Sequence, residues 1–442
     1  MTVDPRSVSA LACATVSAAL LAAQRMLLEI ATRLQSPVDL MFDPHRPVTA
    51  DVVRHLPYHV VDLVFAPPVW IHVAVVLIGV IETVVLYALY RTLRMRYVGQ
   101  FERLALCLVA ALMVAIALDV PVVNGFDVYA DVGYAKLGLA HAYAPPPVRF
   151  GHGFDAISAV WGTPMRPDTA GPGWVVLSSA IVGRIATLGG AIFTLRCVEL
   201  VALLALIGLL ARRGSSTAML ALVALNPAVY FAFIVNAHSD LLGATLLVGA
   251  LAAVGALPIA AAALIACAGL VKLQFVLLAP AVFADRGSLP ARIGWVLLAI
   301  VLACGASFLL AGRPYFTLLG GEIHAVFAPV DRAAQLALVL RCVLLAGVAF
   351  ALADAFVRGV VRRALAWSFV ALTPMLNPAA LAWPLPYAAL ARPVLAEFLM
   401  LLPLAAALLD ASFPRAGLGI LATVAVIAYA IVDITRRRPV SI

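Results

Sequence analysis

Long apolar runs separated by short polar stretches extend along nearly the whole chain. The run "LALCLVAALMVAIALDVPVV" at 104–123 is typical, with one charged residue in twenty. A helix needs ~20 predominantly apolar residues to cross the hydrocarbon core of a bilayer, and there it satisfies its own backbone hydrogen bonds. The pattern therefore predicts an all-α polytopic integral membrane protein with about 12 to 14 transmembrane helices.

Composition supports this interpretation. The 442 residues are 64% hydrophobic and 12% charged, and their mean hydropathy is +1.07. Soluble domains carry about 25% charged residues. The apolar runs leave no space for a soluble domain of ordinary size. We therefore expect a single transmembrane domain over 1–442, in which residues 1–100 supply two accessory N-terminal spans.

Arginine-rich stretches indicate the orientation, because cytoplasmic loops carry an excess of Lys and Arg. If all four such stretches face the cytoplasm, both termini do too, and the chain is a multi-pass protein of the inner (plasma) membrane. The net charge of +8 then reflects these loops and does not indicate nucleic acid. The four stretches are "RTLRMRYVGQFER" (91–103), "ARRG" (211–214), "VRGVVRR" (357–363) and "RRR" (436–438).

This orientation places several polar segments on the outer face. Residues 124–172 form a large first outer loop, and 311–333 form another. The apolar piece 173–189 is short and interrupted by polar residues, so we expect an interfacial helix lying on the outer surface. The stretch "NAHSD" at 236–240 then emerges on the same face as Asp127.

The first outer loop opens with two carboxylates at a spacing of four, Asp127 and Asp131, with Tyr129 between them. A carboxylate at the rim of a partly desolvated cavity has the properties of a general base: a raised pKa and reach to a hydroxyl group. We predict Asp127 as the catalytic base and Tyr129 and Asp131 as substrate-binding residues. Asp131 also stays a candidate for the base.

Two cations are candidates for binding a phosphate. Lys272 interrupts an apolar stretch. A single span here would put the turn after it on the wrong side of the membrane, so we expect two short segments that meet near Lys272 at the outer face. Ionisable residues inside apolar segments are expensive and indicate function by default. Arg196 precedes Glu199 by three residues, so we expect an ion pair between them. A structural role and a phosphate-binding role both stay open for Arg196.

Three further residues complete the predicted site. His238 and Asp240 of "NAHSD" form a second substrate-binding edge facing Asp127. Trp383, in "NPAALAWPLPY" at 377–387, is a third substrate-binding candidate. An ordinary aromatic belt at the membrane interface would also place a Trp there.

The sequence offers no pattern for a cofactor or a metal. The six cysteines all lie inside apolar runs and form no CxxC pair, as expected of small buried hydrophobic residues. HExxH, Walker and Rossmann patterns do not occur. We therefore expect neither a nucleotide cofactor nor a metal site.

The order of these segments resembles a known family. "FDVYADVGYAKLGLAHAY" resembles the first outer loop of the polytopic C-fold (GT-C) glycosyltransferases. "NPAVYFAFIVNAHSDLLGATLLVGALAA" is similar to the "N-P … N-x-H-x-D" segment of bacterial polyprenol-phosphate-mannose-dependent mannosyltransferases. "GLVKLQFVLLAP" and "LNPAALAWPLPY" resemble their later lysine and proline–tryptophan segments. The resemblance runs over 105–386, and Ala170 stands where the family has a tyrosine before Gly171.

The resemblance implies a glycosyltransferase with its active site facing the exterior. Such an enzyme would move a sugar, here mannose, from a polyprenyl-phosphate donor to a hydroxyl group of a glycan or glycolipid acceptor. Transfer would proceed with inversion, with Asp127 as the general base and with Lys272 and Arg196 holding the donor phosphate. The resemblance implies no cofactor, and the bilayer itself is the other partner.

Two alternatives stay open. A transporter or flippase of a lipid-linked saccharide would also use broken helices and charges within apolar segments. Against it, no inverted repeat is evident, and the polar residues gather at one face. A transferase that moves a phosphate-bearing group from a lipid donor would share Asp127 and Lys272.

Overall fold

The computed structural model describes residues 5–34, 69–94, 97–120, 127–147 and 167–327, with scattered residues between 150 and 165 and between 346 and 400. Within these ranges the chain is helical and contains no strand. Five described helices, α1, α5, α6, α11 and α17, are long and apolar enough to cross a membrane, and a bent pair would make a sixth. The protein is thus a helical membrane protein. The predicted total of about 12 to 14 spans includes segments outside the described residues.

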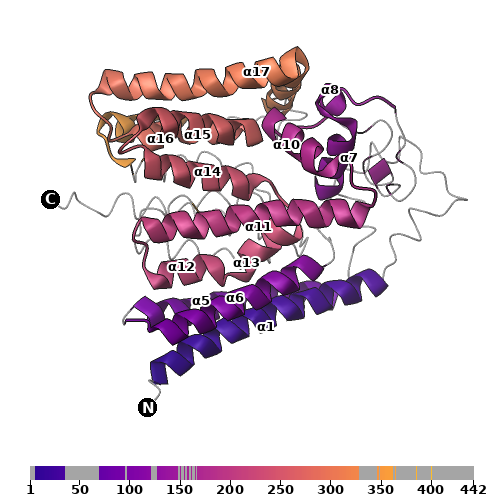
Figure 1. Ribbon diagram of the computed structural model, residues 1–442, viewed down its shortest axis with the longest axis vertical. Helices are drawn as coiled ribbons and strands as arrows, with labels where there is room; N and C mark the ends of the chain where they lie inside the picture. The colour runs from indigo at the N-terminus through magenta and orange to yellow at the C-terminus, as the bar shows by residue number, and fades with distance from the viewer. Residues whose placement is uncertain are drawn as a thin grey trace, which may run out of the picture.

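The first described helix packs against each of the next two (Figure 1). These three are α1 (Pro5–Leu34), α5 (Val69–Arg94) and α6 (Gln100–Asp119). Small residues let helices approach closely in a membrane, and α1 carries a buried stripe of them at a spacing of four: Ala10, Ala14 and Ala18. Both α1 and α5 are candidate spans by length and composition.

Short helices follow and gather at the right-hand end of Figure 1. They are α7 (Asp127–Leu137), α8 (Leu139–Ala142) and α10 (Pro172–Val182). Pro172 begins α10 at a position where its missing N–H costs nothing. With 11 residues, α10 is shorter than a span; the interfacial position predicted for 173–189 stays a prediction. The next helix, α11 (Leu188–Arg212), is a candidate span.

A broken segment follows α11. Helix α12 (Thr217–Ala224) is succeeded by α13 (Pro227–Val229) and the π-helix η1 (Tyr230–Val235), at an angle of 46° to α12. The break falls at Asn226, whose side chain caps α13 by accepting from the Ala228 N–H. Helix α14 (Asp240–Ala253) then runs back beside α11.

The predicted break at Lys272 is confirmed. Helix α15 (Pro258–Val271) ends there, Lys272 is extended (φ −156°, ψ 117°), and the 3-10 helix η2 (Leu273–Leu278) follows. It continues into α16 (Ala279–Phe283). The two short segments fold back on each other, so Lys272 lies at the tip of a helical hairpin.

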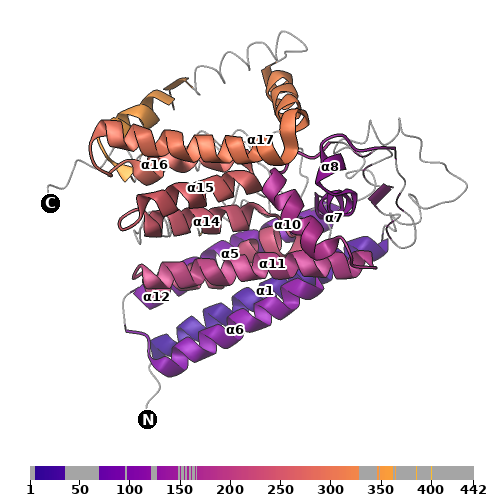
Figure 2. The same cartoon turned by 45° about the horizontal axis from the view of Figure 1, so that its top comes forward.

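The segment 311–333, predicted to be an outer loop, is helical over its described part, and its predicted side of the membrane stays a prediction. Helix α17 (Leu289–Phe327) continues through it, with a sharp break at Gly312, where φ is 63° and ψ is −155°. Only glycine adopts such a conformation readily. Pro314 follows two residues later and is accommodated beside the break. In Figure 2 the ribbon of α17 turns away sharply near its right-hand end.

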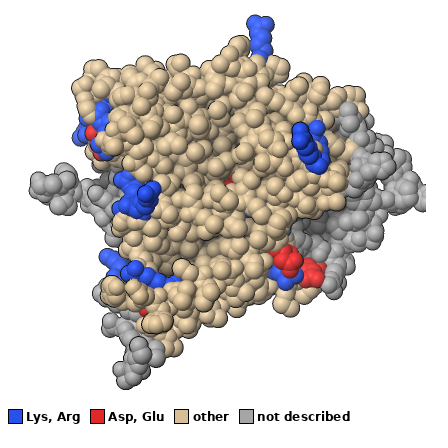
Figure 3. All heavy atoms as spheres, viewed as in Figure 1, with Lys and Arg blue, Asp and Glu red and all other residues tan. Residues whose placement is uncertain are grey.

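The two ends of the bundle differ in charge. We call the end with α7, α8 and α10 the polar end, and the opposite end the basic end (Figure 1). Between them, the face seen in Figure 3 is mostly uncharged, and several of its blue side chains lie along the left side. The basic end carries the arginines at the turns and helix ends there: Arg91, Arg94, Arg103, Arg212, Arg213, Arg286 and Arg292.

Candidate functional site

The structure brings α7 and the "NAHSD" turn together at the polar end. The Asp127 Oδ2 atom lies 3.9 Å from Nδ1 of His238. At this separation the contact is electrostatic and is too long for a hydrogen bond. Asp127 is 59% exposed, whereas His238 is buried. The two segments are predicted to share one face, and they meet as predicted.

The turn itself contains a strained residue. Ala237 has φ of 50°, the only positive φ among the described residues other than glycine. This conformation costs a residue with a Cβ roughly 1–2 kcal/mol. The adjacent Asn236 is buried, and neither its amide oxygen nor its nitrogen has a hydrogen-bond partner among the described residues. Strain and unmet polar groups of this kind concentrate at functional sites.

Lys272, which comes 32 residues after Asp240 in the sequence, contacts the same turn. Its Nζ atom donates to Oδ2 of Asp240 at 2.7 Å. Asp240 begins α14, and its side chain is only 2% exposed. The ion pair therefore joins the tip of the α15–η2 hairpin to the start of α14. Lys272 uses one of the three donors of an ammonium group in this contact.

A third carboxylate, Asp168, belongs to this cluster and is absent from the residues that the sequence singled out. Asp168 is 4% exposed. Its Oδ1 atom accepts from the Ala170 N–H at 2.8 Å, and Oδ2 has no partner among the described residues. The signal available in the sequence is its position, three residues before the Gly171–Pro172 helix start.

Burial and mutual repulsion shift the protonation of these acids. Burial raises the pKa of Asp131 well above its usual range, and the charges of Asp168 and Asp127 add to the shift. Trp174 and Lys272 act in the opposite direction. Burial also raises the pKa of Asp168 to about 7, against the Ala170 N–H and the charge of Lys272. Asp168 can therefore exchange a proton near neutral pH.

Gly171 fixes the geometry of this cluster. Its N–H donates to the Val271 carbonyl at 2.8 Å, directly beside Lys272. A Cβ atom on Gly171 would lie 2.2 Å from the Leu270 carbonyl oxygen. Only glycine lets α10 approach the end of α15 so closely. This contact holds the Asp168 segment against Lys272.

Arg196 has a structural position. Its guanidinium donates to the carbonyl oxygens of Leu118, Val120 and Val235, at 2.8, 2.8 and 2.9 Å. It thereby satisfies carbonyl groups at the end of α6 and at the end of η1. The predicted ion pair with Glu199 is wrong, because the guanidinium turns to these carbonyls instead. Three of its five donors are thus engaged with backbone.

Two other predicted residues are Tyr129 and Trp383, of which only Tyr129 is among the described residues. Tyr129 lies half-buried on α7, where burial raises its pKa and the nearby charge of Arg196 partly offsets the shift. Trp383 lies outside the described residues, so its predicted role stays a prediction. Among the residues that the structure describes, no group of three or more His, Cys, Asp or Glu side chains is arranged to hold a metal ion.

No protein-family model, curated protein or solved structure matches the chain significantly. The function is therefore argued from the site itself. The described chain unites Asp127, Asp131, Asp168, His238 and the Lys272–Asp240 pair at one end of an apolar helical bundle.

Proposed function

We propose that the protein is a glycosyltransferase that moves a sugar, mannose in the simplest case, from a polyprenyl-phosphate donor to a hydroxyl group of a glycan or glycolipid. The observation that carries the proposal is the meeting of Asp127 with His238 beside the Lys272–Asp240 pair. A lipid-linked donor requires acids and a cation together where an apolar bundle ends. The positive-inside rule puts the polar end outside.

The chemistry needs a base that water-borne acceptors can reach. Asp127 is 59% exposed, so we assign it this role, while the buried Asp168, with a pKa of about 7, can hold an exchangeable proton nearby. Asp127 takes the proton of the acceptor hydroxyl while the hydroxyl oxygen bonds to the anomeric carbon. The bond from that carbon to the phosphate oxygen breaks, and the polyprenyl phosphate leaves with the electron pair.

The leaving phosphate needs positive charge. Lys272 keeps two ammonium donors after its contact with Asp240, and its side chain is partly exposed. It can therefore stabilise the charge that develops on the phosphate. Arg196 contributes by holding α6 and η1 in place, since backbone carbonyls engage its guanidinium.

A transporter of a lipid-linked saccharide is the second candidate, and one feature favours it. Glu199, in the candidate span α11, is fully buried, and intramembrane carboxylates often mark transport pathways. A transporter would move its substrate without breaking the bond between sugar and phosphate.

Transfer from a synthetic polyprenyl-phosphate mannose tests the proposal. The purified protein in detergent is incubated with the donor and a pool of glycan and glycolipid acceptors. We expect product formation that falls by about 100-fold or more in Asp127→Asn. Asp285→Asn, an exposed carboxylate at the basic end, is the matched control and should retain activity.

The result can also reassign roles. Activity that survives Asp127→Asn and disappears in Asp131→Asn moves the base to Asp131. An intact donor, with no transfer by the wild type from mannosyl, arabinosyl or aminoarabinosyl lipids, contradicts the transferase. Movement of that donor across a vesicle bilayer would then support the transporter.

A further inference from the structure

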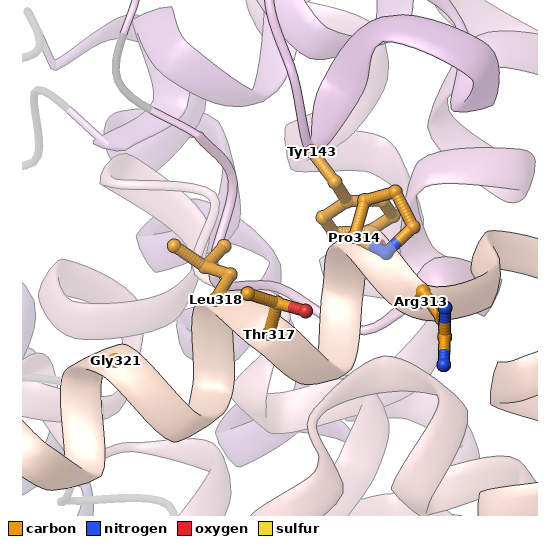
Figure 4. A pocket seen from close by; sticks show the side chains of 6 residues that line it. All are labelled: Tyr143, Arg313, Pro314, Thr317, Leu318 and Gly321. Atoms are coloured by element: carbon orange, nitrogen blue, oxygen red, sulfur yellow. The ribbon is translucent and has the colours of Figure 1, made fainter.

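A groove lies beside the break in α17, next to the carboxylate cluster. Its volume is about 600 Å³, and it is open on one side. Figure 4 shows Arg313, Pro314, Thr317 and Leu318 along one stretch of α17, with Tyr143 coming from a different element. The lining consists of Tyr143, Arg313, Pro314, Thr317, Leu318 and Gly321.

The break sets the depth of this groove in the membrane. From Leu289 to Ala311, α17 runs as one helix, and at 1.5 Å per residue this length covers a hydrocarbon core of ~30 Å. Gly312 then turns the chain. Arg313 therefore lies at the level where lipid headgroups begin.

Among the described residues, an apolar surface lies open beside the break in α17. Phe308, Leu309 and Leu310 precede the break and are exposed, Leu309 by 86%. An apolar surface of this kind faces acyl or isoprenoid chains. The groove above it is mostly apolar, with a guanidinium at one position. This combination suits an amphiphile with an anionic head and a long apolar chain.

Arg313 is available for such a head. It is exposed and has no hydrogen-bond or ion-pair partner among the described residues. Three other cations of the polar end already have protein partners: Lys272 contacts Asp240, Arg196 contacts three carbonyls, and Lys136 contacts the Gly183 and Ile185 carbonyls. Arginine is well suited to phosphate because its planar donors match the phosphate oxygens.

The groove also adjoins the acids. Tyr143 packs against Tyr315 with ring centroids 4.9 Å apart and the rings tilted by 55°, and its hydroxyl donates to the Ala170 carbonyl at 3.0 Å. The N–H of the same residue, Ala170, binds Asp168. Besides burial, the charge of Asp168 raises the pKa of Tyr143. One tyrosine thus separates the groove from the carboxylate cluster.

We propose that this groove is the site where the phosphate of an isoprenoid lipid docks from the bilayer, with Arg313 binding the phosphate. The inference rests on the proposed function for the identity of the lipid. An ordinary phospholipid offers the same phosphate chemistry, but it carries no sugar for the neighbouring acids to act on. The site holds the donor before and during transfer. Lys272 stabilises the negative charge that develops on the phosphate as the sugar leaves it.

Binding measured without turnover tests this directly. A long-chain polyprenyl phosphate is titrated into the full-length protein in detergent, and the complex is followed by native mass spectrometry. We expect Arg313→Gln to weaken binding about tenfold or more, since a hydrogen bond to a charged group contributes ~1.5–3 kcal/mol. Arg313→Lys should retain part of the affinity.

The matched control is Arg184→Gln. Arg184 is also exposed at the polar end and has no partner among the described residues, but it lies outside the groove lining. It should bind like the wild type. Equal losses in both variants would show general surface attraction and overturn the inference, as would unchanged binding in Arg313→Gln.

Ligand comparisons separate the sources of phosphate. The corresponding polyprenol should bind at least tenfold more weakly, and neither inorganic phosphate nor phosphatidylglycerol should compete at equal concentration. Equal competition by either would overturn the isoprenoid assignment. In the transfer assay, Arg313→Gln should raise KM for the donor more than it lowers kcat. Arg313-dependent binding without any transfer would leave the groove intact and reject the transferase.

Discussion

The two ends of the bundle hold their charges in opposite ways. At the basic end, Arg358 pairs with Asp354 at 2.6 Å on an exposed helix surface, and Arg292 donates to the Phe356 carbonyl. At the polar end, Asp168 and Asp240 are almost completely buried. The Arg358–Asp354 pair of the basic end is largely exposed, whereas Asp168 and Asp240 of the polar end are shielded from solvent.

This difference shows that the polar end lowers the stability of the fold more than the basic end does. An exposed ion pair contributes ~0–1 kcal/mol, so it is nearly neutral for stability. Burying an acid costs several kcal/mol unless a partner compensates, and Oδ2 of Asp168 has no partner among the described residues. An apolar side chain would stabilise this end better. Retaining acids there is consistent with a chemical role.

The largest expected effect comes from breaking the buried pair. Lys272→Met leaves Asp240 buried without its partner, which should cost ~3–5 kcal/mol. Arg358→Met removes the exposed pair at the basic end and should cost ~0–1 kcal/mol. Thermal unfolding of both variants in detergent measures the contrast. Similar unfolding midpoints for the two variants would show that the buried pair and the exposed pair contribute equally to stability, which contradicts the comparison.

A smaller effect is expected from widening the contact between α10 and α15. Gly171→Ala places a Cβ against the Leu270 carbonyl, and such overpacking costs ~1–3 kcal/mol. The midpoint of thermal unfolding should fall, and sugar transfer should fall with it because Asp168 moves away from Lys272. The control is Gly189→Ala, whose Cβ would meet nothing within 4 Å. A stable, active Gly171→Ala protein would show that this approach does not position the acids.

The smallest change in stability among these variants is expected for Asp168→Asn, and this change depends on pH. The folded pKa of Asp168, about 7, lies above the ~3.9 of an unfolded aspartate. The folded state therefore binds the proton more tightly, and its contribution to stability is present below pH ~4 and is lost as the pH rises through 7.

Unfolding midpoints of Asp168→Asn and the wild type across this pH range test the sign. At low pH the two proteins should unfold at similar temperatures, because a protonated carboxyl and an amide are similar in size. Toward pH 7 the wild type should lose stability relative to Asp168→Asn. A wild type that gains stability with rising pH, relative to the variant, would show that Asp168 is paired as an anion.

The sequence predicted those features that follow from counting spans, because each span carries the chain to the opposite face of the membrane. The arginine-rich stretches predict an orientation, and that orientation required a break at Lys272 and put "NAHSD" on the same face as Asp127. Both features are present in the structure. Parity is informative because each span must cross a bilayer of fixed thickness, so a miscounted span moves every later residue to the wrong face.

Contacts between distant segments could not be predicted in this way. Arg196 engages carbonyls up to 78 positions away, and no local pattern distinguishes these acceptors from Glu199 three residues ahead. Asp168 was missed because a single aspartate in a loop is ordinary until its burial is known. The helix after Gly312 was missed because Gly and Pro usually end a helix, whereas here they redirect it.

The most direct test is a cryo-EM structure of the Asp127→Asn protein with polyprenyl-phosphate mannose. The account predicts the sugar beside residue 127 and His238 at the polar end, with the phosphate between Arg313 and Lys272 and the isoprenoid along α17. A donor bound at the basic end, or held midway between the ends of the bundle near Glu199, would contradict it.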